Sequence, residues 1–365
     1  MSTPPLLRIE NLRTYFYSRV KQAFVRSVDG VDLEVARGET LGIVGESGSG
    51  KSVTMLSTMG LVTATPGVVS GRVTYDDGQS AHELLDGLAQ QVHIEQRDGR
   101  IMTVRKDNRA WQAQSTLNLA PVRGGRIAMI FQNPKAAMNP YETVGRQIAE
   151  AVRLHTGHKS ERESRERALY WLEQVRIDSP RLRYDNYPYG LSGGMCQRAM
   201  VAMALAAEPR MLIADEPTTG LDATIQARIV DLLEELKSRL GMTMVLISHD
   251  IGVIARLSDR IAVMYGGRVM ESGPATEVLD VNAAGHPYTR ALLASLPSEK
   301  NLTPEGRLPA IEGEVLDTIN VPSGCRFRAR CQRINDGVRT LCETREPELA
   351  EIAPGRRIRC WLYQQ

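Results

Sequence analysis

The sequence predicts an α/β fold built around a largely parallel β-sheet. Short, wholly apolar segments alternate with segments of helical periodicity, and strands that are apolar throughout are typical of a parallel sheet buried on both faces. A glycine-rich loop at residues 45–52, with the sequence GESGSGKS, connects one apolar strand to a segment compatible with a helix. This order of strand, loop and helix is the P-loop pattern, which presents backbone N–H groups to phosphate oxygens.

Residues 8–75 are expected to form short strands separated by turns. Residues 7–16 and 28–35 alternate as strands do, and Asp29-Gly30 is expected to form a turn. Residues 41–44 form the apolar strand before the glycine-rich loop, and residues 72–78 form one more strand with a turn. Residues 79–123 are polar and lack a sustained period, so we interpret them as a surface insertion that contains a hairpin turn at Asp98-Gly99.

The middle of the chain shows the alternation of strands and helices most clearly. Further buried strands are expected at 127–131, 211–214 and 244–247, and helices at 142–205 and 224–240. In the first helical region, apolar residues recur at helical spacing at Ala168, Trp171, Leu172 and Val175. Gly266-Gly267 is expected to turn a late hairpin. After about residue 275, Pro, Gly and Arg become frequent, and we place a domain boundary there.

The composition argues against some classes of protein. The 45 Lys and Arg nearly balance the 43 Asp and Glu, and the net charge of +2 gives no electrostatic support for a nucleic-acid-binding protein. There is no run of 18 apolar residues, so we expect no transmembrane helix. The N-terminus lacks the basic and apolar regions of a secretory signal, and we therefore expect a cytoplasmic protein.

The glycine-rich loop is expected to bind a nucleotide together with Mg²⁺. Lys51 would reach the β- and γ-phosphates, and the hydroxyl of Ser52 would bind Mg²⁺. The segment MLIADEP ends a buried strand with Asp215 and Glu216. Ligands bind at the carboxyl ends of parallel strands, so Asp215 is expected to bind Mg²⁺. Glu216 is expected to act on the attacking water, either as a base or by orienting it.

Four more motifs lie around this loop in the sequence. They are Gln132 after an apolar strand, LSGGMCQR at 191–198, GLD at 220–222 and SHD at 248–250. With the phosphate loop, they make nearly the whole chain resemble the ATP-binding cassette (ABC) ATPases. In that resemblance LSGGMCQR is the signature motif, Gln132 is the Q-loop glutamine, GLD is the D-loop and His249 is the switch histidine. Cys196 stands in the signature motif where relatives commonly carry Arg or Gln, and we expect activity to survive this difference.

The resemblance implies an architecture and a dimer. We expect a P-loop (RecA-like) ABC nucleotide-binding domain at 1–275, with an insertion at about 79–123 and a helical subdomain at about 133–205. A C-terminal extension that contains cysteines follows at 276–365. Two such domains would dimerise head-to-tail, so that each ATP lies between the phosphate loop of one subunit and the signature motif of the other.

The same resemblance implies the residues of the site. The catalytic residues would be Glu216, His249 and Gln132, and the Mg²⁺ ligands Ser52, Gln132 and Asp215. Nucleotide contacts are expected from Phe16, Gly45, Glu46, Ser47, Gly48, Ser49, Gly50, Lys51, Ser52, Val53, Ser192, Gly193, Gly194, Gln197 and Asp222. Of these, Phe16 would stack on adenine, with the neighbouring Tyr15 and Tyr17 as alternatives.

The subfamily is indicated by segments at 131–140, 195–206, 215–226, 286–297 and 324–331, which resemble ATP-binding subunits of bacterial oligopeptide/dipeptide importers. This implies a motor at the cytoplasmic face of the inner membrane. Its partners would be a second, different ATP-binding subunit, two transmembrane permease subunits and an extracytoplasmic solute-binding protein. Residues 133–142 would receive a coupling helix from a membrane subunit. The alternatives are a soluble ABC ATPase that acts on nucleic acid or ribosomes, and a regulatory module with an inactive site.

Four of the five cysteines lie in the last 41 residues, at Cys325, Cys331, Cys342 and Cys360. Four thiolates can bind Zn²⁺ or a [4Fe–4S] cluster, and the spacing lacks the C-x₂-C pairs of zinc ribbons. Some importer subunits that share the GCxFxxRC segment hold a [4Fe–4S] cluster. We therefore expect a [4Fe–4S] cluster bound by these four cysteines, with zinc or a set of unmetallated buried thiols as alternatives.

Overall fold

The computed structural model describes residues 4–62, 64–97, 100–157, 160–283, 285–296 and 309–364. The chain divides into two compact units. The first unit consists of Met1–Val35, Leu41–Asn118 and His249–Gln365, and the second of Ala36–Thr40 and Leu119–Ser248. The predicted boundary near residue 275 stays a prediction, and the residues on both sides of it belong to the first unit.

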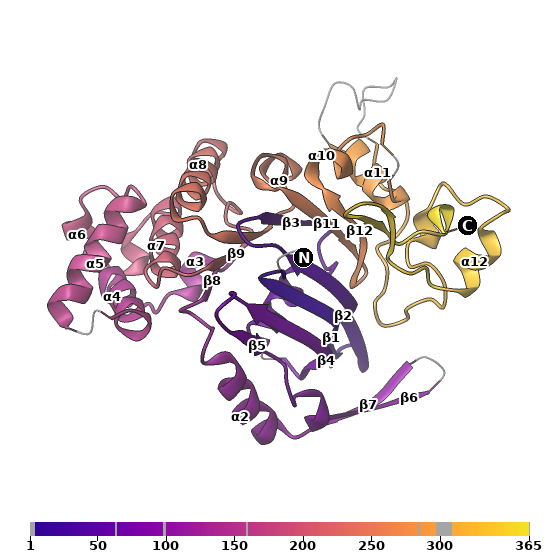
Figure 1. Cartoon of the computed structure of the whole chain (residues 1–365), viewed down its shortest axis with the longest axis horizontal. Coiled ribbons are helices and arrows are strands. Elements are labelled where there is room, and N and C mark those ends of the chain that lie inside the picture. Colours follow the sequence, from indigo (N-terminus) through magenta and orange to yellow (C-terminus); the bar gives the residue numbers. More distant parts are fainter. Residues whose placement is uncertain are drawn as a thin grey trace. The chain divides into compact units, whose positions relative to one another are not determined.

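The first unit contains an antiparallel sheet with the strand order β2-β1-β4-β5. Figure 1 shows β1, β2 and β4 side by side in the early part of the chain. The strands are β1 (Leu7–Ser18), β2 (Ala23–Val35), β4 (Pro66–Asp76) and β5 (Ala81–Glu83). Alternate residues of β1 such as Leu7 and Ile9 are at most 1% exposed, as expected for a sheet with one face against a core.

The expected turn at Asp29-Gly30 is wrong, because both residues lie inside β2. The register between β1 and β2 shifts between the Leu12–Val31 pair and the Arg13–Asp29 pair, so Gly30 is the residue left out. Its φ of +88° lies in the left-handed region that glycine adopts without strain. The Asp-Gly pair therefore forms a β-bulge within a long strand.

A second sheet of the first unit combines strands from distant parts of the chain, in the order β13-β14-β12-β11-β3. These strands are β3 (Thr40–Val44), β11 (Arg260–Tyr265), β12 (Arg268–Pro274), β13 (Ala350–Ala353) and β14 (Arg356–Ile358). β3 and β11 are parallel, and the predicted hairpin at Gly266-Gly267 is confirmed by antiparallel pairing of β11 with β12. β14 pairs with β12, so C-terminal residues extend the sheet that contains β3.

The insertion predicted at 79–123 has more regular structure than expected. β6 (Val92–Arg97) pairs antiparallel with β7 (Arg100–Lys106), which confirms the two strands of the predicted hairpin. The expected turn residues Asp98-Gly99 lie outside the described residues. The helix α2 (Asn108–Leu119) follows, and it was missed because few of its residues are apolar, although Trp111 is 7% exposed.

The other helices of the first unit are short. They are α1 (Lys51–Thr58), α9 (Ile251–Leu257), α10 (Ala275–Val278), α11 (Pro287–Ala294) and α12 (Arg339–Thr344), with 3₁₀ turns η1 (Ala89–Gln91), η4 (Arg328–Arg330) and η5 (Trp361–Tyr363). Two of them matter for the site, because α1 follows the glycine-rich loop and η4 lies in the cysteine-containing segment.

The second unit combines three parallel strands with a group of helices. The strands β8 (Ile127–Ile130), β9 (Met211–Asp215) and β10 (Thr243–Ile247) have the order β10-β9-β8, which confirms the predicted parallel pairing. The helices are α3 (Pro134–Ala137), α4 (Val144–His155), α5 (Glu161–Gln174), α6 (Pro180–Tyr184), α7 (Gly193–Leu205) and α8 (Ala223–Leu240), with a 3₁₀ turn η2 (Pro188–Gly190). Figure 1 shows α4, α5, α6 and α7 together.

The helical face predicted in α5 is confirmed. Ala168, Trp171, Leu172 and the following Val175 are all at most 1% exposed, and α5 packs against α4 and α7. In the described part of the chain, no helix combines the length and the apolar character needed to cross a membrane.

Candidate functional site

The glycine-rich loop of the first unit connects β3 to the N-terminus of α1. Gly45 and Gly50 have φ values of +148° and +101°. A Cβ atom on Gly45 would lie 2.1 Å from the carbonyl oxygen of Met264, and one on Gly50 would lie 2.3 Å from that of Ser27. Both positions therefore require glycine, for the backbone conformation and for the close packing. The loop ends at a helix N-terminus, where the helix dipole favours an anion.

Lys51 is the first residue of α1, and only 6% of it is exposed. Its Nζ donates hydrogen bonds to the carbonyl oxygens of Gly45, at 2.7 Å, and Glu46, at 3.0 Å. The ammonium group therefore lies across the start of the loop. Ser52 follows in the first turn of the same helix and is half-buried. An ammonium group in this place can bind a phosphate oxygen.

The three aromatic residues at 15–17 have different surroundings in β1. Tyr15 is 2% exposed, and its hydroxyl donates to Oδ1 of Asp29 at 2.6 Å. A buried ring of this kind has no free face for a base. Tyr17 is 46% exposed and contacts Phe24 edge-to-face, while Phe16 is half-buried. The adenine contact of Phe16 stays a prediction.

In the second unit, the predicted Gln132 and Glu216 lie together. The Glu216 Oε2 atom accepts hydrogen bonds from Nε2 of Gln132 at 2.9 Å and from the hydroxyl of Thr219 at 2.7 Å. Glu216 directly follows β9, and its own N–H donates to the carbonyl oxygen of Ile247. Its φ of +46° is uncommon for a residue other than glycine, and such strain is concentrated at functional sites.

Asp215 and Thr219 flank Glu216 in the sequence. Asp215, the predicted Mg²⁺ ligand, is the last residue of β9 and is 4% exposed. Thr219 was missed by the sequence analysis, although a hydroxyl three residues after a carboxylate in a tight turn is well placed to contact it. The structure therefore adds Thr219 to Gln132 as a residue that orients the Glu216 carboxylate.

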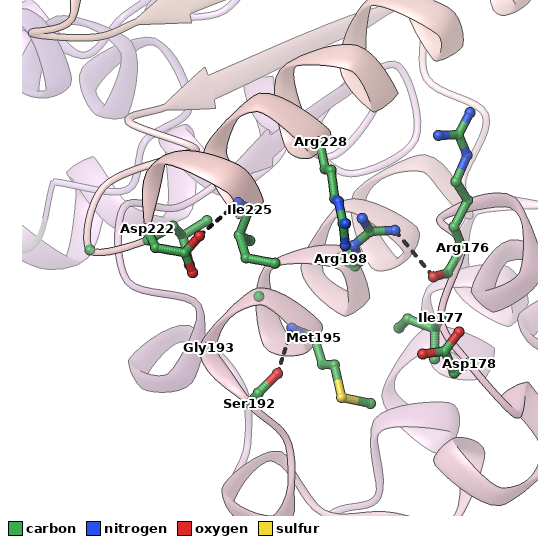
Figure 2. Close-up of a pocket in the computed structure, with 13 residues that line it drawn as sticks. Arg176, Ile177, Asp178, Ser192, Gly193, Met195, Arg198, Asp222, Ile225 and Arg228 are labelled. Atoms are coloured by element: carbon green, nitrogen blue, oxygen red, sulfur yellow. Dashed lines mark hydrogen bonds between the residues drawn. The ribbon is translucent and has the colours of Figure 1, made fainter.

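The predicted signature motif forms the start of α7 in the second unit. Ser192 is the N-cap, and its Oγ accepts from the N–H of Met195 at 3.3 Å. Asp222 caps α8 in the same way, through the N–H of Ile225 at 3.0 Å. Both caps line one cavity of about 720 Å³, as Figure 2 shows. The structure thus brings together the residues predicted from the signature motif and the D-loop.

The same cavity carries an excess of basic side chains, because Arg176, Arg198 and Arg228 line it together with the acidic Asp178 and Asp222. Nη1 of Arg198 donates to the carbonyl oxygen of Arg176 at 3.1 Å, the contact drawn in Figure 2. This arrangement presents a helix N-terminus and several guanidinium groups to the same space. The cavity is therefore suited to an anionic group.

Cys196 and Gln197 of the signature motif do not line the cavity. Gln197 is 2% exposed within α7. The Cys196 Sγ atom donates to the carbonyl oxygen of Pro188 at 3.3 Å, and burial raises the pKa of the thiol. Cys196 is therefore a neutral buried thiol that leaves Ser192 and the cavity side of the helix unchanged.

His249, the predicted switch histidine, is exposed and precedes α9 in the first unit. The next residue, Asp250, is the N-cap of this helix, and its carboxylate accepts from the N–H groups of Gly252 at 2.8 Å and Val253 at 3.3 Å. This cap fixes the backbone next to His249. Its contact with the γ-phosphate stays a prediction.

The prediction of a [4Fe–4S] cluster is wrong. All four C-terminal cysteines line one cavity, but its volume is only about 10 Å³, which is room for about one water molecule and not for a cluster. Among the described residues, no three or more His, Cys, Asp or Glu side chains are arranged to hold a metal ion. Burial raises the pKa of Cys325 to about 12 and that of Cys360 to about 11, so these groups are neutral thiols in a packed core.

Comparisons with known proteins identify the family. Residues 28–219 match the ABC transporter family, and residues 270–337 match the family described as the C-terminal region of oligopeptide/dipeptide transporters. A relative from Sinorhizobium fredii (strain NBRC 101917 / NGR234), a probable peptide ABC transporter ATP-binding protein named y4tR, is 43% identical over 98% of this chain and 94% of its own length. The oligopeptide transport ATP-binding protein AppD of Bacillus subtilis (strain 168) is 38% identical over 100% of this chain and 98% of its own length.

A solved structure agrees with this result. The ATP-binding cassette MJ0796, in a dimeric post-hydrolysis state bound to ADP and Pi, has a TM-score of 0.57 and 25% identity. The match covers 74% of this chain and 98% of that cassette. The fold and the phosphate loop define an ATPase cassette. The chain belongs to the ABC transporter family, as an ATP-binding subunit.

Proposed function

We propose that this chain is the ATP-hydrolysing motor subunit of an importer that takes up peptides. The observation that carries the proposal is the phosphate loop, where Lys51 is buried across the loop carbonyls at the N-terminus of α1. The peptide class is supported by the match to the C-terminal region of oligopeptide/dipeptide transporters and by the names of relatives that match over nearly the whole chain. Those names give no support to a soluble ATPase that acts on nucleic acid or ribosomes.

In the proposed reaction, the loop N–H groups and Lys51 bind the phosphates of ATP. Ser52, Asp215 and Gln132 offer a hydroxyl, a carboxylate and an amide oxygen, which are donors suited to Mg²⁺, and this ion would offset the phosphate charge. Glu216 orients the attacking water and accepts its proton, while Gln132 and Thr219 fix the carboxylate. His249 would contact the γ-phosphate.

The signature cavity would complete the ATP site of a second subunit in a head-to-tail dimer. Ser192, Gly193 and Gly194 would meet the γ-phosphate there, at the N-terminus of α7 and next to the guanidinium groups of the cavity. We propose that the second subunit is a different chain. The assembly would also include two permease subunits, which contact residues 133–142, and a solute-binding protein. The chain would then lie at the cytoplasmic face of the inner membrane.

The first test is ATP binding by a Lys51→Ala variant. Loss of a charged partner to phosphate is worth about 1.5–3 kcal/mol, or about tenfold to a hundredfold in affinity. We expect this weakening in the Kd for ATP, measured by titration calorimetry. Lys21→Ala, an exposed lysine of the same unit, is the matched control and should bind ATP like the unmodified chain. Failure of the unmodified chain to bind ATP would exclude the proposed function.

The importer part of the proposal needs a separate test. The tagged chain should co-purify with membrane permease subunits from detergent-solubilised membranes of its native cell. Recovery with ribosomes or DNA in place of permease subunits would contradict it.

A further inference from the structure

Glu46, the second residue of the phosphate loop, is tied to the C-terminal part of the same unit. Its carboxylate accepts two hydrogen bonds from Arg330, Nη1 to Oε2 at 2.7 Å and Nη2 to Oε1 at 3.0 Å. Its backbone N–H donates to the hydroxyl of Tyr288 at 2.8 Å. Its carbonyl oxygen accepts from Lys51. Two partners of Glu46, Arg330 and Tyr288, therefore lie more than 240 residues away in the sequence.

The side chain of Arg330 is also held by hydrogen bonds outside the phosphate loop. Arg330 ends the 3₁₀ turn η4, and its side chain is 4% exposed. Its Nε donates to the carbonyl oxygen of Glu312 at 3.0 Å, and its Nη2 donates to that of Ile311 at 3.1 Å. The hydrogen bonds with Glu46 raise the pKa of Arg330 above its ordinary value. The guanidinium is thus a permanently charged fork held in one orientation, and it binds the carboxylate in a bidentate manner.

The side chain of Tyr288 is held in place by burial and aromatic packing. Tyr288 lies in α11, is fully buried, and packs against Tyr265 and Phe327 with ring centroids 4.8 Å and 5.3 Å away. Burial raises the pKa of its hydroxyl, which therefore stays neutral and can accept from the N–H of Glu46. Phe327 comes three residues before Arg330, so one aromatic cluster supports both contacts to the loop.

We propose that Arg330 is a positioning residue for nucleotide binding, through which the C-terminal region sets the affinity of the phosphate loop. Without Arg330, the carboxylate of Glu46 would be unpaired in the loop that must receive phosphate oxygens. The negative carboxylate and the negative phosphate would then repel each other. Paired with Arg330, the carboxylate is neutralised and the first turn of the loop is held in place. This inference rests on the proposed ATP binding by the same loop.

The test compares Arg330→Gln with Arg328→Gln. Arg328 belongs to the same turn η4, but it donates to the carbonyl oxygen of Glu343 and does not contact the loop. We expect Arg330→Gln to weaken the Kd for ATP about fivefold to tenfold and to raise KM by a similar factor, with less than a twofold change in kcat. Arg328→Gln should stay within about twofold of the unmodified chain in all three quantities.

A double variant separates positioning from a loss of stability. In Glu46→Gln with Arg330→Gln no unpaired carboxylate is left, and we expect the Kd for ATP to return to within about threefold of the unmodified chain. A purely structural role predicts that the double variant melts no higher and binds no better than Arg330→Gln. If Arg330→Gln does not fold, Arg330→Lys serves in its place, since it keeps the charge, loses the fork and should weaken binding about twofold to threefold.

Three results would overturn the inference: an unchanged Kd in the folded Arg330 variant, the same loss in Arg328→Gln, or a double variant that is no better than the single one. These differ from failure of the proposed function, in which the unmodified chain itself would not bind ATP.

Discussion

The phosphate loop of the first unit and the signature turn of the second unit both lead into a helix N-terminus, but their supports differ. α1 has Gly50 at its N-cap and no side-chain cap. The loop before it is held by Arg330 and Tyr288, far away in the sequence. α7 is capped by Ser192, which accepts from an N–H only three residues further on.

This difference has a consequence for each half of the proposed site. A loop that depends on distant partners takes its shape only when the whole first unit is folded, and its Glu46 carboxylate is then already paired with Arg330. A local cap needs only its own helix, and the signature turn opens onto a cavity of about 720 Å³. The phosphate loop is therefore preorganised by tertiary structure, whereas the signature turn is available to a group that arrives from outside.

The largest expected effect concerns Glu216, which separates chemistry from binding. Glu216→Gln removes the base but leaves the phosphate loop intact, so turnover should fall about 10²–10⁴-fold while the Kd for ATP changes little. Steady-state ATP hydrolysis should be measured with the partner subunit's site inactivated. Glu234→Gln, an exposed carboxylate on α8, is the control and should hydrolyse ATP normally. If Glu216→Gln loses ATP binding and turnover equally, Glu216 does not act in the chemistry alone.

The parts of the molecule that the sequence predicted well depend on local pattern. The glycine-rich loop and the apolar strands follow from neighbouring residues, and the signature motif and the D-loop follow from the family resemblance. The Asp29-Gly30 bulge was missed because a turn and a bulge require the same backbone freedom. The cysteine spacing gave no information about the volume between the thiols, and nothing near Glu46 indicates that Arg330 is its partner.

A smaller effect is expected from pH, through the buried Asp29 in the first unit. Burial alone would raise its pKa, but the guanidinium of Arg326, 2.6 Å away, and the hydroxyl of Tyr15 lower it from 3.8 to about 2. The carboxylate therefore stabilises the fold fully above pH 3.8, and this contribution is lost as the pH falls toward 2. At about 1.4 kcal/mol per pKa unit, the loss is about 2 kcal/mol.

Urea unfolding between pH 6 and pH 2 measures this contribution. Asp29→Asn should be the less stable protein at pH 6, and its difference in free energy of unfolding from the unmodified chain should narrow by about 2 kcal/mol toward pH 2. If the difference in free energy of unfolding between Asp29→Asn and the unmodified chain does not narrow, the ion pair of Asp29 with Arg326 is not acid-sensitive in this range.

The smallest effect is expected at Ser192, where the support is local. Ser192→Ala removes the cap, worth about 1 kcal/mol, and the hydroxyl that faces the cavity. We expect ATP-driven association of the subunits, followed by sedimentation, to weaken about fivefold, because that step would use the signature turn. Binding of ATP to the isolated chain should not change, since the phosphate loop has its own supports. Ser192→Thr keeps the hydroxyl and should associate normally. A change in ATP binding by Ser192→Ala would mean that the phosphate loop and the signature turn are not independent in the isolated chain.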